Sequence, residues 1–571
     1  MLLLNPQQRT HTQPDGRSEE IMRRTIEFFE ARGKERLKAD DHARAWYGEF
    51  LDFVREERIF ATLLTPAGDS ASDGRWDTSR LCEFAEILGF YGLPYWYTWQ
   101  VTILGLGPIW MSHNEQARER AAQLLEDGAI FAFGLSEKEH GADLYSSDME
   151  LVPQGDGTYL ARGDKYYIGN GNKAAMVSVF GKDTTTGEYV FFAVDSQHER
   201  YELVKNVVAS QNFVSEFRLN DYPVTDADVL QRGDAAWNAA LNTVNIGKYN
   251  LGWASIGICT HALYEALNHA ANRRLYGMAV TDFPHVRRMF TDAYARTVTM
   301  KLVALRACDY MRSASIEDRR YLLFNPVVKM KVTTQGEQAI HLLWDILAAK
   351  GFEKDMYFES AARDISALPR LEGTVHVNIA LIVKFMASYL FGDAPMPQIG
   401  RRDDAVNDDF LFDQGPTKGL RSIVFPDWEI AFKRWDVPNV GVFREQVAVL
   451  KDLLATATPD EGQRKDIDFL MAIGSLFTLV VYGQLALEGA ERESVGDDLV
   501  DELFGVLVTD FSAAAVELHG KPSTSAEQAA LCLAMVQRPV FDQARYDGVW
   551  DEVMSLNGAY ELSWDGAAVT A

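Results

Sequence analysis

The chain has 571 residues, of which 47% are hydrophobic, so it is long enough to bury a large core and to form three or four structural units. Its formal net charge of -26 argues against binding to nucleic acid, because a duplex-binding protein needs a basic face to displace counterions. The four cysteines, Cys82, Cys259, Cys308 and Cys532, have no paired spacing, so we expect no disulfide framework, no metal site and a reducing cytoplasm.

The periodicity of apolar residues changes along the chain and predicts five segments. Residues 1–129 are predicted to form a helical domain, because apolar residues recur three and four positions apart. Residues 130–234 alternate with a period of two between Gly, Asp and Asn turns, which predicts a small β domain. Helical spacing returns over 235–395 as a predicted bundle, a polar linker follows over 396–425, and a further helical domain is predicted over 426–571.

No segment is predicted to cross a membrane. The leucines at Leu2–Leu4 are followed at once by polar residues, which is too short for the apolar part of a signal peptide. The longest apolar run, Phe469–Tyr482, is shorter than the roughly 20 residues that span a bilayer. We therefore expect a buried core helix there.

Four segments carry patterns that point to chemistry. They are Phe131–Asp143 (FAFGLSEKEHGAD), Arg162–Asn172 (RGDKYYIGNGN), a long helical stretch over Lys248–Val286 that includes RRLYG, and Asp345–Asn378 with Arg-Asp and Glu-Gly-Thr. Each has an ordinary explanation in isolation, such as a strand before a Gly turn or basic residues at the C-terminus of a helix. Their order and spacing are what favour a functional interpretation.

The helical, β, helical order and the four segments resemble the acyl-CoA dehydrogenase family over about residues 79–386. The resemblance implies a fold that is mainly α with a central β domain. It comprises an N-terminal helical domain, a middle β-barrel or sheet and a C-terminal four-helix bundle, here followed by an additional C-terminal helical domain.

The resemblance implies a flavoprotein with FAD as cofactor. Ser136 stands where the family usually has threonine, Tyr167 is at the position that stacks on the flavin, and Arg273 would reach the pyrophosphate of a flavin in a neighbouring subunit. That last role implies a homodimer or a larger homo-oligomer. The residues implied to contact FAD are Phe133, Leu135, Ser136, Gly141, Ala142, Tyr167, Ile168, Gly169, Arg273, Tyr276, Asp345, Ala349, Thr374 and Asn378.

The resemblance also implies that Glu372 is the catalytic base, which removes the α-proton of an acyl thioester while a hydride leaves the β-carbon. That proton is too weakly acidic for an aqueous glutamate, so the base needs a dry site and a polarised thioester carbonyl. The residues implied to contact the substrate are Ala142, Asn245, Lys248, Leu371 and Gly373.

Several positions depart from the family pattern, and four of them bear on the cofactor. Gly169 stands where the family usually has a threonine whose hydroxyl meets the flavin, so either Gly169 opens space for oxygen or water, or a backbone N–H takes over that contact. Asp345 replaces a glutamine, and Ala348 and Ala349 replace two glycines near the adenosine diphosphate. A carboxylate beside a pyrophosphate is repulsive.

Three functions stay open at this point. We favour a cytoplasmic acyl-CoA dehydrogenase of fatty acid metabolism that acts on an acyl-CoA or an acyl-carrier-protein thioester and passes electrons to an electron-transfer flavoprotein. His140-Gly141 in the first segment is similar to the acyl-CoA oxidases, which use O2 and release H2O2. The departures at Gly169, Asp345, Ala348 and Ala349 fit a catalytically inactive binding or scaffold protein.

Overall fold

The computed structural model describes residues 2–9, 12–69 and 73–566. The chain forms two compact units. We call His11–Asn250, Asp403–Lys418 and Leu562–Ala571 the helix–sheet unit, and Met1–Thr10, Leu251–Arg402 and Gly419–Glu561 the helical unit. The five predicted segments are a finer division than these two units, and their boundaries stay a prediction.

The helix–sheet unit starts with helices and continues into one mixed sheet. Its helices are α1 (Gly16–Ala43), α2 (Gly48–Glu56), α3 (Ile59–Leu64), α4 (Thr78–Tyr91), α5 (Leu93–Trp110), α6 (Glu115–Glu126) and α7 (Gly233–Gly247). Its strands are β1 (Phe131–Gly134), β2 (Glu150–Pro153), β3 (Thr158–Gly169), β4 (Met176–Asp183), β5 (Tyr189–Val194), β6 (Tyr201–Asn206), β7 (Val214–Thr225) and β8 (Val229–Arg232). The strand order is β6-β7-β3-β2-β4-β5-β8, and β1 pairs in parallel with β4.

Helix α5 is the core of this unit and is buried along its whole length. It approaches β1 closely because Gly105 has no side chain: a Cβ there would lie 2.5 Å from the backbone nitrogen of Ala132. The neighbouring helix α4 is capped at its N-terminus by Asp77, whose side chain accepts a hydrogen bond from the backbone N–H of Ser79. The first strand that carries predicted site residues is therefore packed directly on a rigid helix.

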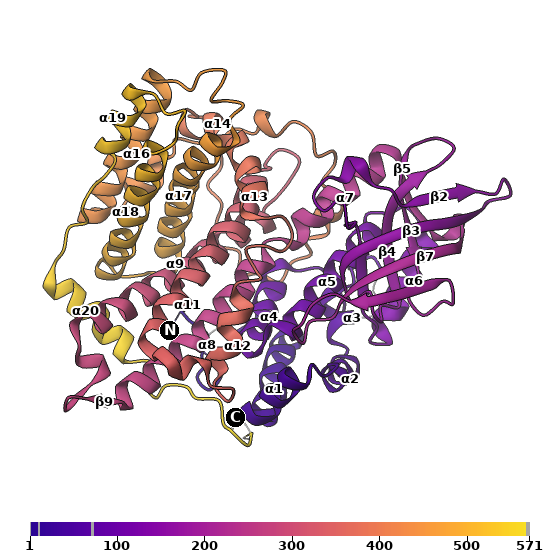
Figure 1. Cartoon of the computed structure of the whole chain (residues 1–571), viewed down its shortest axis with the longest axis horizontal. Helices are drawn as coiled ribbons and strands as arrows, with labels where there is room; N and C mark the ends of the chain where they lie inside the picture. Colours follow the sequence, from indigo (N-terminus) through magenta and orange to yellow (C-terminus); the bar gives the residue numbers. More distant parts are fainter. Residues whose placement is uncertain (1, 10–11, 70–72, 567–571) are drawn as a thin grey trace. The chain divides into compact units, whose positions relative to one another are not determined.

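The helical unit contains the remaining helices and a small hairpin. The elements before the polar connector are α8 (Asn250–Asn272), β9 (Arg274–Leu275), β10 (Met278–Ala279), α9 (Pro284–Arg312), α10 (Tyr321–Val327), the π-helical turn η4 (Val328–Val332), α11 (Thr333–Leu347), α12 (Tyr357–Ile365), α13 (Val375–Ile382) and α14 (Met386–Leu390). Those after it are α15 (Glu429–Phe432), α16 (Pro438–Thr456), α17 (Ile467–Arg492), α18 (Asp497–His519), α19 (Ala526–Ala534) and α20 (Gln543–Met554). Figure 1 shows α16, α17, α18 and α19 gathered side by side in orange and yellow.

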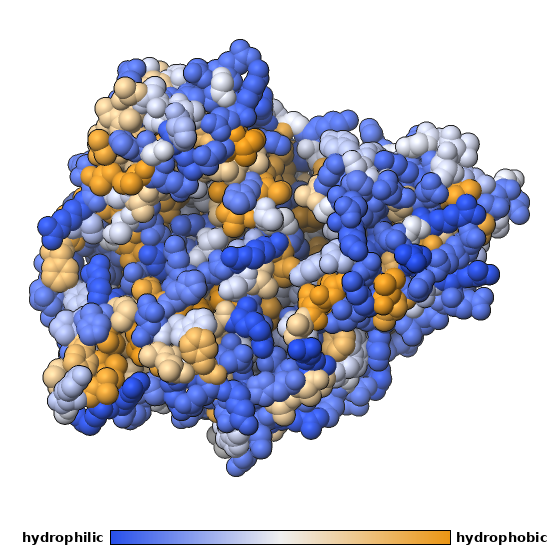
Figure 2. All heavy atoms as spheres, in the orientation of Figure 1, coloured by the Kyte–Doolittle hydropathy of each residue, from blue (hydrophilic) through white to orange (hydrophobic). Residues whose placement is uncertain are grey.

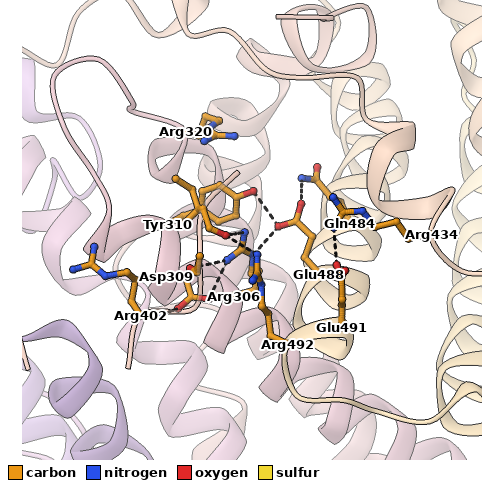
Figure 3. A network of polar contacts seen from close by, with 12 residues as sticks. Arg306, Asp309, Tyr310, Arg320, Arg402, Arg434, Gln484, Glu488, Glu491 and Arg492 are labelled. Carbon is orange, nitrogen blue, oxygen red and sulfur yellow. Dashed lines mark hydrogen bonds and ion pairs between the residues drawn. The ribbon is translucent and has the colours of Figure 1, made fainter. Parts of the chain in front are cut away.

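A buried polar network joins α9 to α17 within the helical unit (Figure 3). The guanidinium of Arg306 lies 2.6 Å from the carboxylate of Glu488, which also accepts hydrogen bonds from Tyr310 at 3.0 Å and from Gln484 at 2.7 Å. A second carboxylate, that of Asp309, lies 3.0 Å from Arg306. Because removing one partner of such a buried pair is costly, this network ties the additional C-terminal helices to the preceding bundle.

The predicted fold class is confirmed: the chain is mainly helical, with a central sheet and an additional helical region at its C-terminal end. All four cysteines lie in the described part of the chain, where they are buried and form no disulfide. Among the described residues, α17 is the one helix that is long and apolar enough to cross a membrane, but 83% of its most apolar window is buried. That burial agrees with the predicted core helix.

Candidate active site

The loop after β1 carries several predicted flavin contacts, and a buried ion pair holds it in place. Lys165 of β3 is fully buried, and its Nζ donates to Glu137 at 2.6 Å and to the backbone carbonyl of Leu135 at 3.0 Å. Glu137 also accepts hydrogen bonds from the hydroxyl of Ser147 and the backbone N–H of Asp148, both at 2.7 Å. The pair therefore fixes both the start of the loop and its return to β2.

The charges of this pair follow from its surroundings. Burial lowers the pKa of Lys165 to about 8, although Glu137 favours its charged form. For Glu137, burial opposes ionisation, but Lys165 and the hydrogen bonds from Asp148 and Ser147 outweigh it and hold the pKa below its usual value. Glu137 is therefore a carboxylate at neutral pH. Sequence reasoning missed this pair.

Tyr167 presents its ring at the surface of the sheet from a strained position. Its side chain is 43% exposed, its φ is 65°, and it lies where the pairing of β3 with β7 shifts register between Tyr166 and Ile168. A left-handed backbone is unfavourable for an aromatic residue, and such strain gathers at functional sites. The bulge turns the ring outward, as a stacking role for a flat ligand requires.

The other predicted residues of this unit differ in exposure. Phe133 is half-buried and stacks on Phe191, with ring centroids 5.9 Å apart, whereas Gly141 and Ala142 are exposed. The side chain of Ile168 is buried in the core of the sheet, so any contact that Ile168 makes with a ligand would be through its backbone. Ser136 is half-buried, and its carbonyl accepts a hydrogen bond from Tyr166 at 3.0 Å.

Gly169 does not open a void on the side where a threonine would stand. A Cβ at this position would lie 2.6 Å from Cγ1 of Val101 and 2.8 Å from the ring of Tyr97, both on α5. The interpretation that a missing side chain makes room there for oxygen or water is therefore wrong, because α5 already fills that space. The alternative, a contact through a backbone N–H, stays a prediction.

Asn245 and Lys248 lie at the C-terminal end of α7 in the same unit. Lys248 is the residue that follows the helix, and it is buried, with 6% of its surface exposed. Asn245 is half-buried. Their contact with a substrate stays a prediction.

In the helical unit, Glu372 lies in the tight loop that joins α12 to α13. Glu372 and Gly373 have consecutive positive φ values of 50° and 88°. Thr374 caps α13, with its hydroxyl accepting a hydrogen bond from the backbone N–H of Val377. Asn378 is buried, and its amide donates to the carbonyls of Gly373 and Thr374, both at 3.0 Å. The loop thus presents a half-buried carboxylate on a backbone fixed from α13.

The fold brings Leu371, Glu372, Gly373, Thr374 and Asn378 together because they share this one loop and the first turns of α13. The amide of Asn378 is used within the loop, which gives it a structural role besides its predicted contact with the cofactor. Nothing in the sequence pattern signalled that role.

The hairpin of β9 and β10 exposes an unusual amount of apolar surface. Tyr276 at its tip is 96% exposed with a φ of 53°, and Leu275 and Met278 are also exposed. Figure 2 shows apolar atoms at the lower left, in the region where Figure 1 places β9 and α20. Arg273, which precedes the hairpin, is exposed as well. Exposed apolar surface of this kind is typical of an interaction site.

Asp345 and Ala349 lie at the end of α11 and are both exposed. Ala348, between them, has a φ of 54°, a conformation that glycine would adopt at a lower cost. Of the two alanines that replace family glycines, Ala348 therefore keeps the backbone conformation that glycine favours.

Comparison with known proteins shows which family the chain resembles. The family model described as "Acyl-CoA dehydrogenase, C-terminal domain" matches residues 235–387. The short-chain specific acyl-CoA dehydrogenase of Megasphaera elsdenii is 22% identical over 357 residues, which are 59% of this chain and 90% of that protein. The chain is similar to the acyl-CoA dehydrogenase family.

Two further proteins extend the comparison. Subunit CarC of the caffeyl-CoA reductase-Etf complex of Acetobacterium woodii is 24% identical and covers 58% of this chain and 88% of its own. A solved acyl-CoA dehydrogenase from Bacillus anthracis, complexed with FAD, superposes with a TM-score of 0.73 at 15% identity and covers 97% of this chain and 96% of its own. That match includes the additional C-terminal helices, so they are part of a known form of the fold.

Proposed function

We propose that this protein catalyses the FAD-dependent α,β-dehydrogenation of an acyl-CoA to the trans-2-enoyl thioester, with Glu372 as the base that removes the α-proton. The observation that carries the proposal is the loop of Glu372, where a half-buried carboxylate stands at a left-handed residue on a backbone fixed by hydrogen bonds. Surface turns do not need such a constrained carboxylate, whereas a general base needs a fixed position to meet its proton.

The residues of the helix–sheet unit fit the cofactor that this reaction needs. Tyr167 offers an outward ring for a flat ligand, and the Glu137–Lys165 pair fixes the loop of Leu135 and Ser136. FAD, when bound, accepts the hydride that leaves the β-carbon. Support for FAD also comes from the solved relative from Bacillus anthracis, which is complexed with it. Asp345 is the one predicted contact whose charge opposes a pyrophosphate.

The chain's own residues would divide the work as follows. Glu372 takes the α-proton, and we propose that Leu368 and Ile365, which are buried and precede it in the chain, help to keep water from the loop. Lys248 and Asn245 are proposed to contact the thioester-bearing ligand. The substrate can be a CoA or a carrier-protein thioester of a fatty acid or related acyl group.

We propose an electron-transfer flavoprotein as the partner that removes the electrons, because relative CarC is named as a subunit of a complex with Etf. We also propose a cytoplasmic homodimer or larger homo-oligomer, since the exposed Leu275, Tyr276 and Met278 of the hairpin suit burial against a second copy. The oxidase alternative keeps the same base and cofactor but delivers the electrons to O2.

The test uses anaerobic mixing of the purified, FAD-loaded protein with a series of acyl-CoAs of different chain length. We expect loss of the oxidised flavin absorbance with some members of the series. Glu372→Gln should keep FAD and slow that loss by about 100-fold or more, since a general base contributes about 10² to 10⁴ in rate. Glu353→Gln, a change at an exposed carboxylate of the same unit, serves as the matched control and should bleach normally.

Each other outcome has a meaning. Normal bleaching by the Glu372→Gln variant would show that the base lies elsewhere. Peroxide formation in air at the rate of turnover would identify an oxidase. Protein that stays colourless and does not take up added FAD would support the scaffold alternative.

A further inference from the structure

The loop of Glu372 is bound by a buried lysine, Lys329. Lys329 lies in the π-helical turn η4 between α10 and α11, and none of its surface is exposed. Its Nζ donates to the carbonyl of Pro369 at 2.7 Å and also to the carbonyl of Gly373. These two carbonyls stand on either side of Glu372 in the chain, so one ammonium group spans the residue that we propose as the base.

The loop needs such support because its backbone is unfavourable. A residue with a Cβ rarely adopts the φ of 50° that Glu372 has, and Gly373 continues in the left-handed region at 88°. The carbonyl of Gly373 accepts hydrogen bonds from both Lys329 and the Asn378 amide. Donors from two separate helical segments therefore meet at the residue next to Glu372.

Lys329 lies in a π-helical turn. Wide turns of this kind are rare and occur often at functional sites. In η4, Lys329 binds the loop, whereas Lys331, two residues later, lies 3.6 Å from the carboxylate of Asp510 on α18. A buried ammonium group is costly unless it is hydrogen-bonded, and charge-assisted bonds to carbonyls are strong. The two lysines of one turn thus serve two different neighbours.

We propose that Lys329 is a positioning residue for Glu372: its ammonium group clamps the carbonyls of Pro369 and Gly373 and keeps the carboxylate in the place that proton abstraction requires. This inference rests on the proposed function of Glu372. Lys329 itself touches backbone atoms of the loop, so its loss should affect the placement of the base more than the affinity for substrate.

The experiment compares Lys329→Met with Lys331→Met, a matched loss of an ammonium group from the same π-helical turn. Backbone hydrogen exchange of the protein without substrate, followed by mass spectrometry, should be at least tenfold faster over residues 369–376 in Lys329→Met and unchanged there in Lys331→Met. The rate of flavin bleaching should fall at least tenfold in Lys329→Met and less than twofold in Lys331→Met. Dissociation constants for a 3-thia-acyl-CoA, which can lose an α-proton but no hydride, should change less than twofold in both.

Exchange of the α-protons of that 3-thia-acyl-CoA for deuterium measures proton abstraction separately from hydride transfer. In Lys329→Met the rate of this exchange should fall along with the rate of flavin bleaching. Lys329→Gln, which keeps a shorter hydrogen-bond donor, should have an intermediate rate, and it replaces Lys329→Met if that variant does not fold. Wild-type loop exchange and wild-type rates in a folded Lys329 variant would overturn the inference, even where Glu372→Gln is inactive. An active Glu372→Gln variant would instead overturn the proposed function.

Discussion

Asp510 provides a quantitative test of how the additional C-terminal helices are held to the bundle. The residue lies on α18, where both of its carboxylate oxygens bind Arg296 of α9, at 2.9 and 3.0 Å. Gln335 of α11 donates a further hydrogen bond at 2.9 Å, and Lys331 lies 3.6 Å away. Replacement by asparagine removes the charge and keeps the size, so it tests the ionic part of these contacts.

The expected magnitude follows from the pKa of Asp510. Burial alone would raise it, but Lys331, Arg296 and Gln335 outweigh burial and lower the pKa from 3.8 to about 2. Because the folded value lies below the unfolded one, the carboxylate contributes stability above pH 4 and loses it as the pH falls through 2. That contribution is about 2 kcal/mol, of which about half is lost by pH 3. Asp510→Asn should cost about 2 to 5 kcal/mol at pH 7, since it also leaves buried cations without their anion.

The assay is denaturant unfolding of wild type and Asp510→Asn at pH 7, 5 and 3, followed by tryptophan fluorescence. We expect a difference in the free energy of unfolding that is the same at pH 7 and 5 and smaller by about 1 kcal/mol at pH 3. Asp452→Asn, at an exposed position of α16, is the matched control and should change stability by less than about 0.5 kcal/mol. Equal stabilities at pH 7, or a difference that does not shrink at pH 3, would refute the reasoning.

Two more predictions concern the helix–sheet unit. Gly169→Ala should destabilise the protein by about 1 to 3 kcal/mol in thermal unfolding, because the added Cβ would meet Val101. Adding Val101→Ala should recover part of that loss, whereas additive effects of the two changes would argue against the contact. Glu137→Gln should cost about 3 to 5 kcal/mol in denaturant unfolding, because it leaves the buried ammonium group of Lys165 without its carboxylate. An unchanged unfolding midpoint would show that the loop does not depend on this pair.

The order of helices and strands could be predicted because periodicity is a local property of the sequence. The strands of the mixed sheet run from Phe131 to Arg232, inside the stretch whose alternating pattern predicts a β domain. The loop of Glu372 was predictable for a different reason, since Glu-Gly-Thr stands in register with three other segments. Both kinds of prediction use residues that are near one another in the chain or in a known spacing.

The contacts that hold the site residues were not predictable in this way. Lys165 and Glu137 are 28 residues apart in the chain. The one sequence feature that pointed to the burial of Lys165 is its spacing of four from Ala161 in the same strand, because alternate residues of a strand face the same side. The sequence could not decide between the two alternatives at Gly169, because the residue that fills its space, Val101, comes from a helix far earlier in the chain. Lys329 lies in a stretch with ordinary helical spacing, and nothing in that spacing indicates a π-helical turn.

The two lysines together suggest a common solution to one physical problem. Loops that carry site residues have backbone carbonyls without partners in a helix or a strand ladder, and buried carbonyls need donors. An ammonium group offers three donors on a flexible stem, so it can bind two carbonyls at once or a carbonyl and a carboxylate. Lys165 does the second at Leu135 and Glu137, and Lys329 does the first at Pro369 and Gly373. Because each lysine acts within its own unit, the loop after β1 and the loop of Glu372 are held independently, and a change at one lysine should leave the other loop intact.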